Sequence, residues 1–198
     1  MSIFIPLHLP DATIFYCSNF LSTVESQALF QKLITTTAWQ QDTITLFGKT
    51  HLQPRLTAWY AQNGQKYIYS GICMDAKPFP SYLVPTLKRV INCCNTSFNS
   101  VLLNLYRDGN DSNGWHSDDE PELGKAPIIA SLSLGVARDF KLKHKYLPQE
   151  KHTLLLEPGS LLLMGAPTQQ FWKHQLPKRK RCTEPRINLT FRTVLKHI

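Results

Sequence analysis

From residue 101 onward the hydrophobic pattern takes a period of two, which constrains the fold more than any other feature. Short alternating or apolar segments occur at 101–106, 128–134, 140–142, 153–156, 161–164 and 187–194. Turn-forming residues separate them, as in Glu157-Pro158-Gly159-Ser160. Short strands joined by turns, without alternating helices, favour a sandwich or barrel over a βαβ sheet.

The segment before residue 101 predicts two helices that brace one side of these strands. Ser22-Thr23-Val24-Glu25 has the pattern of a capping box, and the apolar spacing after it predicts a helix over 22–36. Pro85 suits the first turn of a second helix over 85–94. We therefore predict one mainly β domain with N-terminal helices (α+β), comprising an extension over 1–95 and a core over 96–198.

The charge balance favours a polyanionic partner, nucleic acid before membrane. Lys and Arg number 22 against 14 Asp and Glu, which gives a net charge of +8. No apolar stretch approaches the ~20 residues that span a bilayer, so no membrane association is expected. Five cysteines without a C-x-x-C motif favour reduced thiols. We expect an intracellular monomer, cytoplasmic in a bacterium and nuclear in a eukaryote.

Two histidines and one aspartate are candidate metal ligands. His116 and Asp118 would point the same way in an extended segment, because side chains alternate between faces. His174 could be the third ligand, or an exposed histidine in a charged loop. Two His and one carboxylate form the facial triad of non-haem Fe(II) oxygenases. A zinc hydrolase remains an alternative, although it usually has three protein ligands and a general base.

The last predicted strand carries polar side chains on one face and apolar ones on the other. The polar set is Arg186, Asn188, Thr190 and Arg192. This face could be solvated, as is common in antiparallel sheets. Alternatively, it could be an anion site inside a barrel, because buried arginines need anionic partners. Arginine grips a carboxylate with two parallel hydrogen bonds, as a dicarboxylate co-substrate would require.

In combination these motifs resemble the AlkB family of Fe(II)- and 2-oxoglutarate-dependent dioxygenases, from about residue 10 to the C-terminus. The resemblance rests on Asn104-Leu105-Tyr106, His116-Ser117-Asp118, His174 and the segment 186–192. It implies a double-stranded β-helix (jelly roll) core that uses Fe(II), 2-oxoglutarate and O₂.

The resemblance also assigns roles to single residues. The iron ligands and catalytic residues would be His116, Asp118 and His174. Those that bind 2-oxoglutarate would be Asn104, Tyr106, Arg186, Asn188, Thr190 and Arg192. Within this set, Arg192 would pair with the far carboxylate and Arg186 with the carboxylate nearer the metal.

On the substrate side, the resemblance implies a base flipped out of the nucleic acid into the pocket. The base would lie under a lid over 66–71 and beside acidic residues, a set made of Tyr67, Tyr69, Ser70, Asp119 and Glu120. An aromatic finger would fill the gap left by the base. The predicted DNA contacts are Phe47, Gly48, Arg55, Arg138, Lys141, Lys143, Lys178, Arg179 and Lys180.

The implied function is oxidative dealkylation of N-alkylated bases in DNA, including double-stranded DNA. The expected lesions are 1-methyladenine, 3-methylcytosine and etheno adducts, and the alkyl group would leave as formaldehyde. Two further alternatives stay open at this point. One is a 2-oxoglutarate dioxygenase directed at RNA or protein, and the other is a catalytically silent jelly roll that binds nucleic acid.

Overall fold

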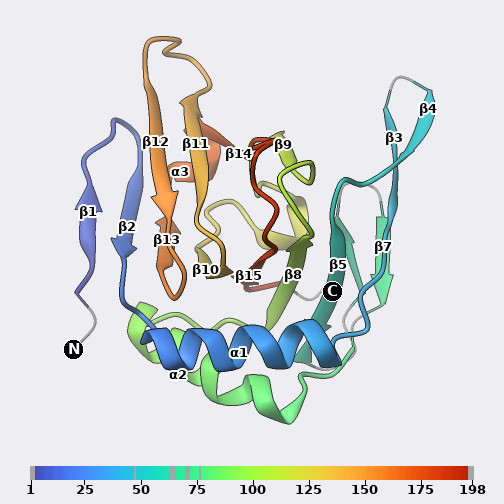
Figure 1. Ribbon diagram of the computed structural model, residues 1–198. Helices are drawn as coiled ribbons and strands as arrows, with labels where there is room; N and C mark the ends of the chain where they lie inside the picture. Colours follow the sequence, from blue (N-terminus) through green and yellow to red (C-terminus); the bar gives the residue numbers. More distant parts are fainter. Residues whose placement is uncertain (1–2, 47, 63–65, 70–71, 76, 196–198) are drawn as a thin grey trace.

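The strands of the protein form two main antiparallel sheets, seen in a computed structural model that describes residues 3–46, 48–62, 66–69, 72–75 and 77–195 (Figure 1). The larger sheet contains β1 (Ile5–Leu7), β2 (Thr13–Cys17), β5 (Leu56–Ala61), β8 (Ser100–Tyr106), β10 (Ile129–Gly135), β13 (Leu161–Gly165) and β15 (Arg186–Arg192). The smaller sheet contains β9 (Asn113–His116), β11 (Arg138–His144), β12 (Lys151–Leu156) and β14 (Trp172–Leu176).

Each sheet has a strand order that differs from the order along the chain. The larger sheet runs β1-β2-β13-β10-β15-β8-β5, and the smaller runs β12-β11-β14-β9. Every pairing within the two sheets is antiparallel. The predicted jelly-roll core is therefore confirmed. The larger sheet takes β1, β2 and β5 from before residue 96, so the division into an extension and a core stays a prediction.

Both predicted helices are confirmed and lie together across one side of the strands (Figure 1). Ser22 is the N-cap residue of α1 (Thr23–Thr36), and Glu25 completes the capping box. α2 (Val84–Cys94) has its proline in the first turn and ends at Asn95, which adopts the left-handed conformation. Shorter helical turns are η2 (Ser81–Leu83), η3 (Pro121–Leu123) and α3 (Thr168–Phe171). No helix in the described ranges is long and apolar enough to span a membrane.

Two apolar cores lie on the two faces of the larger sheet. One core packs α1 and α2 against the face that carries Leu132 and Leu189. The other core lies between the sheets and includes Leu102, Leu142 and Trp172. The central strands are consequently buried on both faces, so any polar side chain that points between the sheets is removed from water.

Two hairpins stand apart from the main sheets. β3 (Thr43–Leu46) and β4 (Lys49–Leu52) pair as an antiparallel hairpin that projects from the body of the protein (Figure 1). Gly48 lies in its turn with φ of 75°, whereas the predicted finger residue Phe47 lies outside the described residues. β6 (Lys66–Tyr69) lies in the predicted lid and pairs with β7 (Ile72–Asp75). The side chains of Tyr67 and Tyr69, and all of Ser70, lie outside the described part.

Candidate metal centre and anion pocket

His116, Asp118 and His174 converge at one end of the smaller sheet. β9 and β14 are neighbours, and their register places His116 opposite His174. Asp118 follows β9, and its Oδ2 lies 3.7 Å from His174 Nε2. One ligand atom from each residue lies within 4.8 Å of the others. His174 is thus buried on a strand, which the sequence pattern did not predict, and the exposed-loop alternative is excluded.

The surroundings of the three residues set the protonation states that a metal requires. Burial lowers the pKa of His174 to about 3 and also lowers the pKa of His116. Burial would raise the pKa of Asp118, but that pKa is lowered overall, chiefly by the charge of the Arg192 guanidinium. Neutral imidazoles and an anionic carboxylate are the ligand forms that bind a divalent metal.

Neighbouring groups orient these ligands. His116 Nδ1 donates to the Gly114 carbonyl oxygen at 2.7 Å, which leaves Nε2 as the ligand atom. Gln169 Oε1 accepts the backbone N–H of Asp118 at 2.9 Å. The Phe140 ring stacks on His174, with centroids 5.1 Å apart. No local sequence pattern marks Gln169 or Phe140 as part of the site, because each lies far along the chain from the ligand that it supports.

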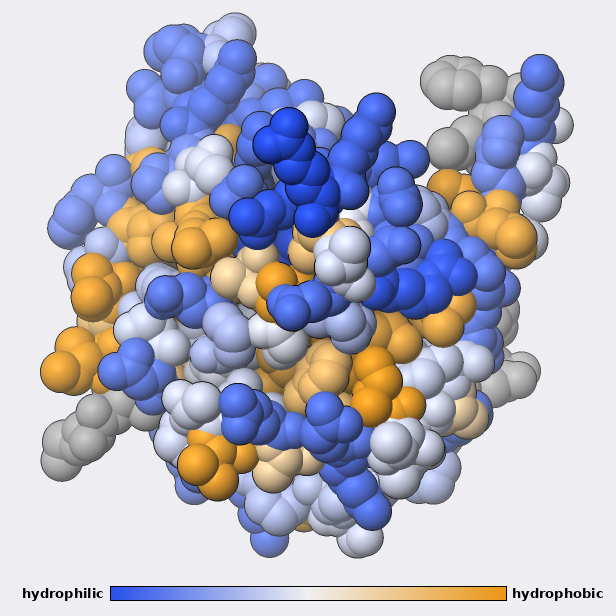
Figure 2. All heavy atoms as spheres, viewed as in Figure 1, coloured by the Kyte–Doolittle hydropathy of each residue, from blue (hydrophilic) through white to orange (hydrophobic). Residues whose placement is uncertain are grey.

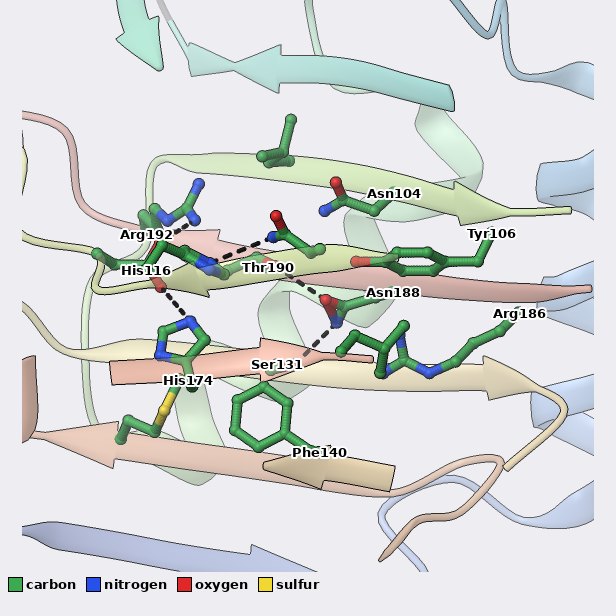
Figure 3. Close-up of a pocket in the computed structure, with 15 residues that line it drawn as sticks. Asn104, Tyr106, His116, Ser131, Phe140, His174, Arg186, Asn188, Thr190 and Arg192 are labelled. Carbon is green, nitrogen blue, oxygen red and sulfur yellow. Dashed lines mark hydrogen bonds and ion pairs between the residues drawn. The ribbon is translucent and has the colours of Figure 1, made fainter. Parts of the chain in front are cut away.

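The polar face of β15 lines the same pocket. Arg186, Asn188, Thr190 and Arg192 all point between the sheets with Asn104 and Tyr106 of β8 (Figure 3). The strand is buried over its whole length, so the solvated alternative for this face is excluded. One pocket therefore joins the metal ligands to a row of polar groups that includes two arginines.

Serines of β10 support the row from the neighbouring strand. Asn188 Nδ2 donates to Ser131 Oγ at 2.8 Å, and Arg186 Nη2 donates to Ser133 Oγ at 2.9 Å. Both serines alternate with buried leucines in β10. That alternation is visible in the sequence and could have marked them as residues that face a polar pocket.

Comparison with known proteins identifies the family. A family model described as the 2OG-Fe(II) oxygenase superfamily matches residues 13–192. The chain belongs to this superfamily. Its reaction class implies Fe(II), 2-oxoglutarate and O₂, and the His-Asp-His triad is the ligand set that such an iron takes.

Similar proteins confirm the resemblance to the AlkB family. Alpha-ketoglutarate-dependent dioxygenase alkB homolog 3 of Bos taurus is 44% identical over 188 residues, which are 90% of this chain and 65% of that protein. DNA oxidative demethylase ALKBH2 of Mus musculus is 43% identical over 159 residues, 77% of this chain and 66% of that protein. The chain thus spans just under two thirds of the length of these relatives. A solved structure of OsALKBH1 shares the fold, with a TM-score of 0.68 at 17% identity, covering 96% of this chain and all of that one.

The two arginines of the oxygenase pocket lie at opposite ends, in the reverse of the expected order. Arg192 Nη2 bonds Asp118 Oδ1, whereas Arg186 lies beside Tyr106, its cross-strand partner (Figure 3). The expectation that Arg186 is nearer the metal ligands is therefore wrong. Arg192 follows Arg186 by six positions, which is about 20 Å between their Cα atoms along the strand, and the triad lies at the Arg192 end.

Arg186 tests whether the pocket fits a dicarboxylate. The side chain is 1% exposed, and burial lowers the pKa of its guanidinium to about 10. Within the described ranges, its Nε has no hydrogen-bond partner and no carboxylate pairs with it. A buried cation with a spare donor is costly unless an anion meets it. The residues present fit a superfamily co-substrate with a carboxylate at that end.

Two arginines predicted to contact DNA are buried instead, so that prediction is wrong for both. Arg55 is 5% exposed, and its Nε donates to Asn104 Oδ1 at 2.9 Å. Its Nη1 donates to Asn113 Oδ1 at 3.1 Å, so Arg55 positions residues of the pocket wall. Arg138 is 1% exposed and donates to three backbone carbonyl oxygens, those of Asp108, Asp111 and Pro177. An isolated sequence motif does not reveal whether an arginine is enclosed.

The basic segment 178–181 is exposed and attached to the body by backbone hydrogen bonds. Arg179 N–H donates to the Gly109 carbonyl oxygen at 2.7 Å, and Gly109 N–H donates to the Cys182 carbonyl oxygen at 2.7 Å. Arg138 adds its bond to Pro177, just before the segment. Hydrophilic side chains gather over this loop between β14 and β15 and over the β11–β12 hairpin (Figure 2).

The other predicted substrate contacts lie around the pocket. Asp119 is exposed, and its Oδ2 lies 3.2 Å from Lys145 Nζ. Glu120 is half-buried directly after it. Lys141 and Lys143 lie on β11 and point away from the pocket, because Leu142 between them is the one that faces the core. Their roles in binding stay predictions.

Proposed function

We propose that the protein is a dioxygenase that removes alkyl groups from N-alkylated bases in DNA, with Fe(II) and 2-oxoglutarate. One observation carries the proposal: a single buried pocket joins a two-histidine, one-carboxylate triad to a row of polar groups with a buried arginine at each end. A zinc hydrolase has no use for this row. The similarity to a protein named DNA oxidative demethylase supports DNA as the substrate.

The pocket residues divide the work by position. His116, Asp118 and His174 would hold the iron, which with 2-oxoglutarate and O₂ supplies hydroxylation of an alkyl carbon that then leaves as formaldehyde. Arg192, beside Asp118, would bind the carboxylate nearer the metal. Arg186 and Tyr106 would bind the far carboxylate, with the remaining co-substrate contacts from Asn104, Asn188 and Thr190. The sheets bury all of these residues except His116, which is half-buried.

The base and its strand would approach from the mouth of the pocket. The base contacts that we propose are Tyr67, Tyr69, Ser70, Asp119 and Glu120. The carboxylates of Asp119 and Glu120 would attract bases that carry a positive charge once alkylated, such as 1-methyladenine and 3-methylcytosine. Phosphates would meet the exposed basic segment, with Lys178, Arg179 and Lys180. The β3–β4 hairpin would present Phe47 and Gly48 to the duplex.

A repair assay tests this function. A duplex carrying one 1-methyladenine, incubated with protein, Fe(II), ascorbate and 2-oxoglutarate in air, is expected to lose one CH₂ by mass spectrometry. The His174→Ala variant and the reaction without 2-oxoglutarate should both leave it unchanged. Succinate formed without repair of this duplex or its single strand would move the substrate to RNA or protein. Absence of both products would refute the dioxygenase.

Gly109 provides a separate test of the basic segment. In the Gly109→Ala variant, the new Cβ would collide with the backbone carbonyl of Arg179 and displace the segment. We expect weaker binding to a lesion-free duplex, and a log–log salt slope that is shallower by about 0.9 for each phosphate that the segment no longer neutralises. The change should also cost about 1–3 kcal/mol of unfolding free energy.

Gly114→Ala is the matched control, because a Cβ there meets no atom within 4 Å. Its duplex affinity, measured by fluorescence anisotropy at several salt concentrations, should equal that of the unmodified protein. If Gly109→Ala also binds the duplex with unchanged affinity and slope, the segment does not contact phosphates.

A further inference from the structure

The smaller sheet has an outer face that the proposed dealkylation does not use. Residues that alternate with the pocket and core residues on its strands lie there. The basic and aromatic residues among them are Trp115 on β9, Lys141 and Lys143 on β11, Lys151 on β12 and Lys173 on β14. We call these five residues the outer lysine face. Because His116 and His174 point into the pocket, their neighbours Trp115 and Lys173 point away from it.

The lysines of this face are close together and lack anionic partners. Lys143 lies directly opposite Lys151 on one side and opposite Lys173 on the other. Like charges opposite one another destabilise a sheet. Within the described part of the chain, none of the four lysines of the face forms a salt bridge. Asp139 adds one exposed carboxylate to this face of β11. Four lysines therefore lie with one acidic residue on the described part of the face, and the surplus positive charge is complementary to a polyanion.

Trp115 adds an aromatic surface to the charge. It is 37% exposed, whereas Trp59 and Trp172 are buried in the core between the sheets. Lys143 Nζ lies 4.5 Å from the centroid of the Trp115 ring. Lysines next to an exposed aromatic ring are the combination that binds single-stranded nucleic acid, through phosphate contacts and base stacking.

The position of Trp115 connects this face with the pocket. β9 is the edge strand of the smaller sheet, next to β14 alone. Trp115 and His116 are consecutive, so their side chains lie on opposite faces of that edge. A strand whose target base enters beside His116 can pass around the edge and reach the outer lysine face within a short distance.

We propose that the outer lysine face binds single-stranded nucleic acid, with one base stacked on Trp115 and phosphates on the lysines. This site is distinct from the pocket and needs neither iron nor 2-oxoglutarate. It also gives Lys141 and Lys143 a role that differs from contact with the duplex at the pocket mouth. An acidic protein would bind the lysines without stacking on Trp115. A contribution of Trp115 to binding therefore distinguishes nucleic acid from an acidic protein as the partner.

Binding of a lesion-free strand to the full chain, with EDTA present, tests the proposal. The probe is a fluorescently labelled thymidine homopolymer of about 16 nucleotides, read by anisotropy. Trp115→Ala is expected to weaken binding about tenfold or more, and Trp115→Phe to restore most of it. The double variant Lys143→Gln/Lys173→Gln should reduce the log–log salt slope by about 1.4, because each phosphate on a single strand contributes ~0.7.

The matched control is Lys32→Gln/Lys88→Gln, which removes two exposed lysines from α1 and α2 on the far side of the larger sheet. It should leave affinity and slope unchanged. Equal binding by Trp115→Ala and the unmodified protein would overturn the proposal, and so would an effect of the lysine variant without one at Trp115. Because the assay contains neither iron nor lesion, failed repair of 1-methyladenine would refute the proposed function and leave this inference standing.

Discussion

Asp118→Ala is expected to abolish metal binding and dealkylation together, with a loss of turnover of about a thousandfold or more. The residue supplies the carboxylate of the triad and is 1% exposed. Two imidazoles alone do not complete the facial set of an Fe(II) oxygenase. The change also leaves Arg192 buried without the carboxylate that it bonds. Breaking a buried pair in this way should lower the free energy of unfolding by about 3–5 kcal/mol.

Titration with Co(II), followed by absorbance, measures the metal site apart from turnover. Succinate formation and urea unfolding complete the comparison. Asp139→Ala is the control, because Asp139 is an exposed carboxylate on β11 that does not line the pocket of the triad. It should keep metal affinity, succinate formation and stability. Co(II) binding of unchanged affinity in Asp118→Ala would show that the triad is not the metal centre.

Arg186→Met is expected to raise the KM for 2-oxoglutarate about a hundredfold while the protein stays folded. Charge-assisted hydrogen bonds to a carboxylate contribute about 1.5–3 kcal/mol each, and Arg186 would make them at the far end of the pocket. Its removal costs little stability, because a buried charge replaced by an apolar side chain of similar length is often neutral or stabilising. The single bond to Ser133 is the described hydrogen bond that the fold loses.

Steady-state kinetics at varied 2-oxoglutarate, with succinate as the product measured, give this value. Fe(II) affinity should be unchanged, because Arg186 lies at the opposite end from the triad. Arg186→Lys keeps the charge but cannot make two parallel hydrogen bonds. Its KM for 2-oxoglutarate should therefore lie between the values for the unmodified protein and for Arg186→Met. A lower kcat at unchanged KM would place Arg186 outside the co-substrate site.

The sequence predicted those parts of the site that depend on local alternation. The period of two in β15 separated Arg186, Asn188, Thr190 and Arg192 from the apolar residues between them, and the structure confirms that division. The capping box at Ser22 and the proline of α2 predicted both helices, because their signals lie within one turn. His116 and Asp118 are separated by one residue, so the same alternation predicted that their side chains point the same way.

Features that depend on the packing of distant segments could not be predicted in this way. β14 is a short strand of mixed polarity, Trp-Lys-His-Gln-Leu, and its pairing with β9 and β11 is what reveals it. The burial of Arg55 and Arg138 depends on strands and loops that lie up to 58 residues away along the chain. The order of the two pocket arginines depends on which end of β15 meets the triad, which alternation does not specify.

β15 belongs to two parts of the protein at once, which limits how its sequence can change. One face of the strand forms the core against the helices, and the other lines the pocket that we propose for the co-substrate. Substitutions there alter folding and chemistry at once, so mutational drift in this strand is severely restricted. The β3–β4 and β6–β7 hairpins belong to neither main sheet. With the substrate contacts that we propose for these hairpins, substrate preference would diversify there while the metal centre stays unchanged, and directed evolution toward new lesions should begin there.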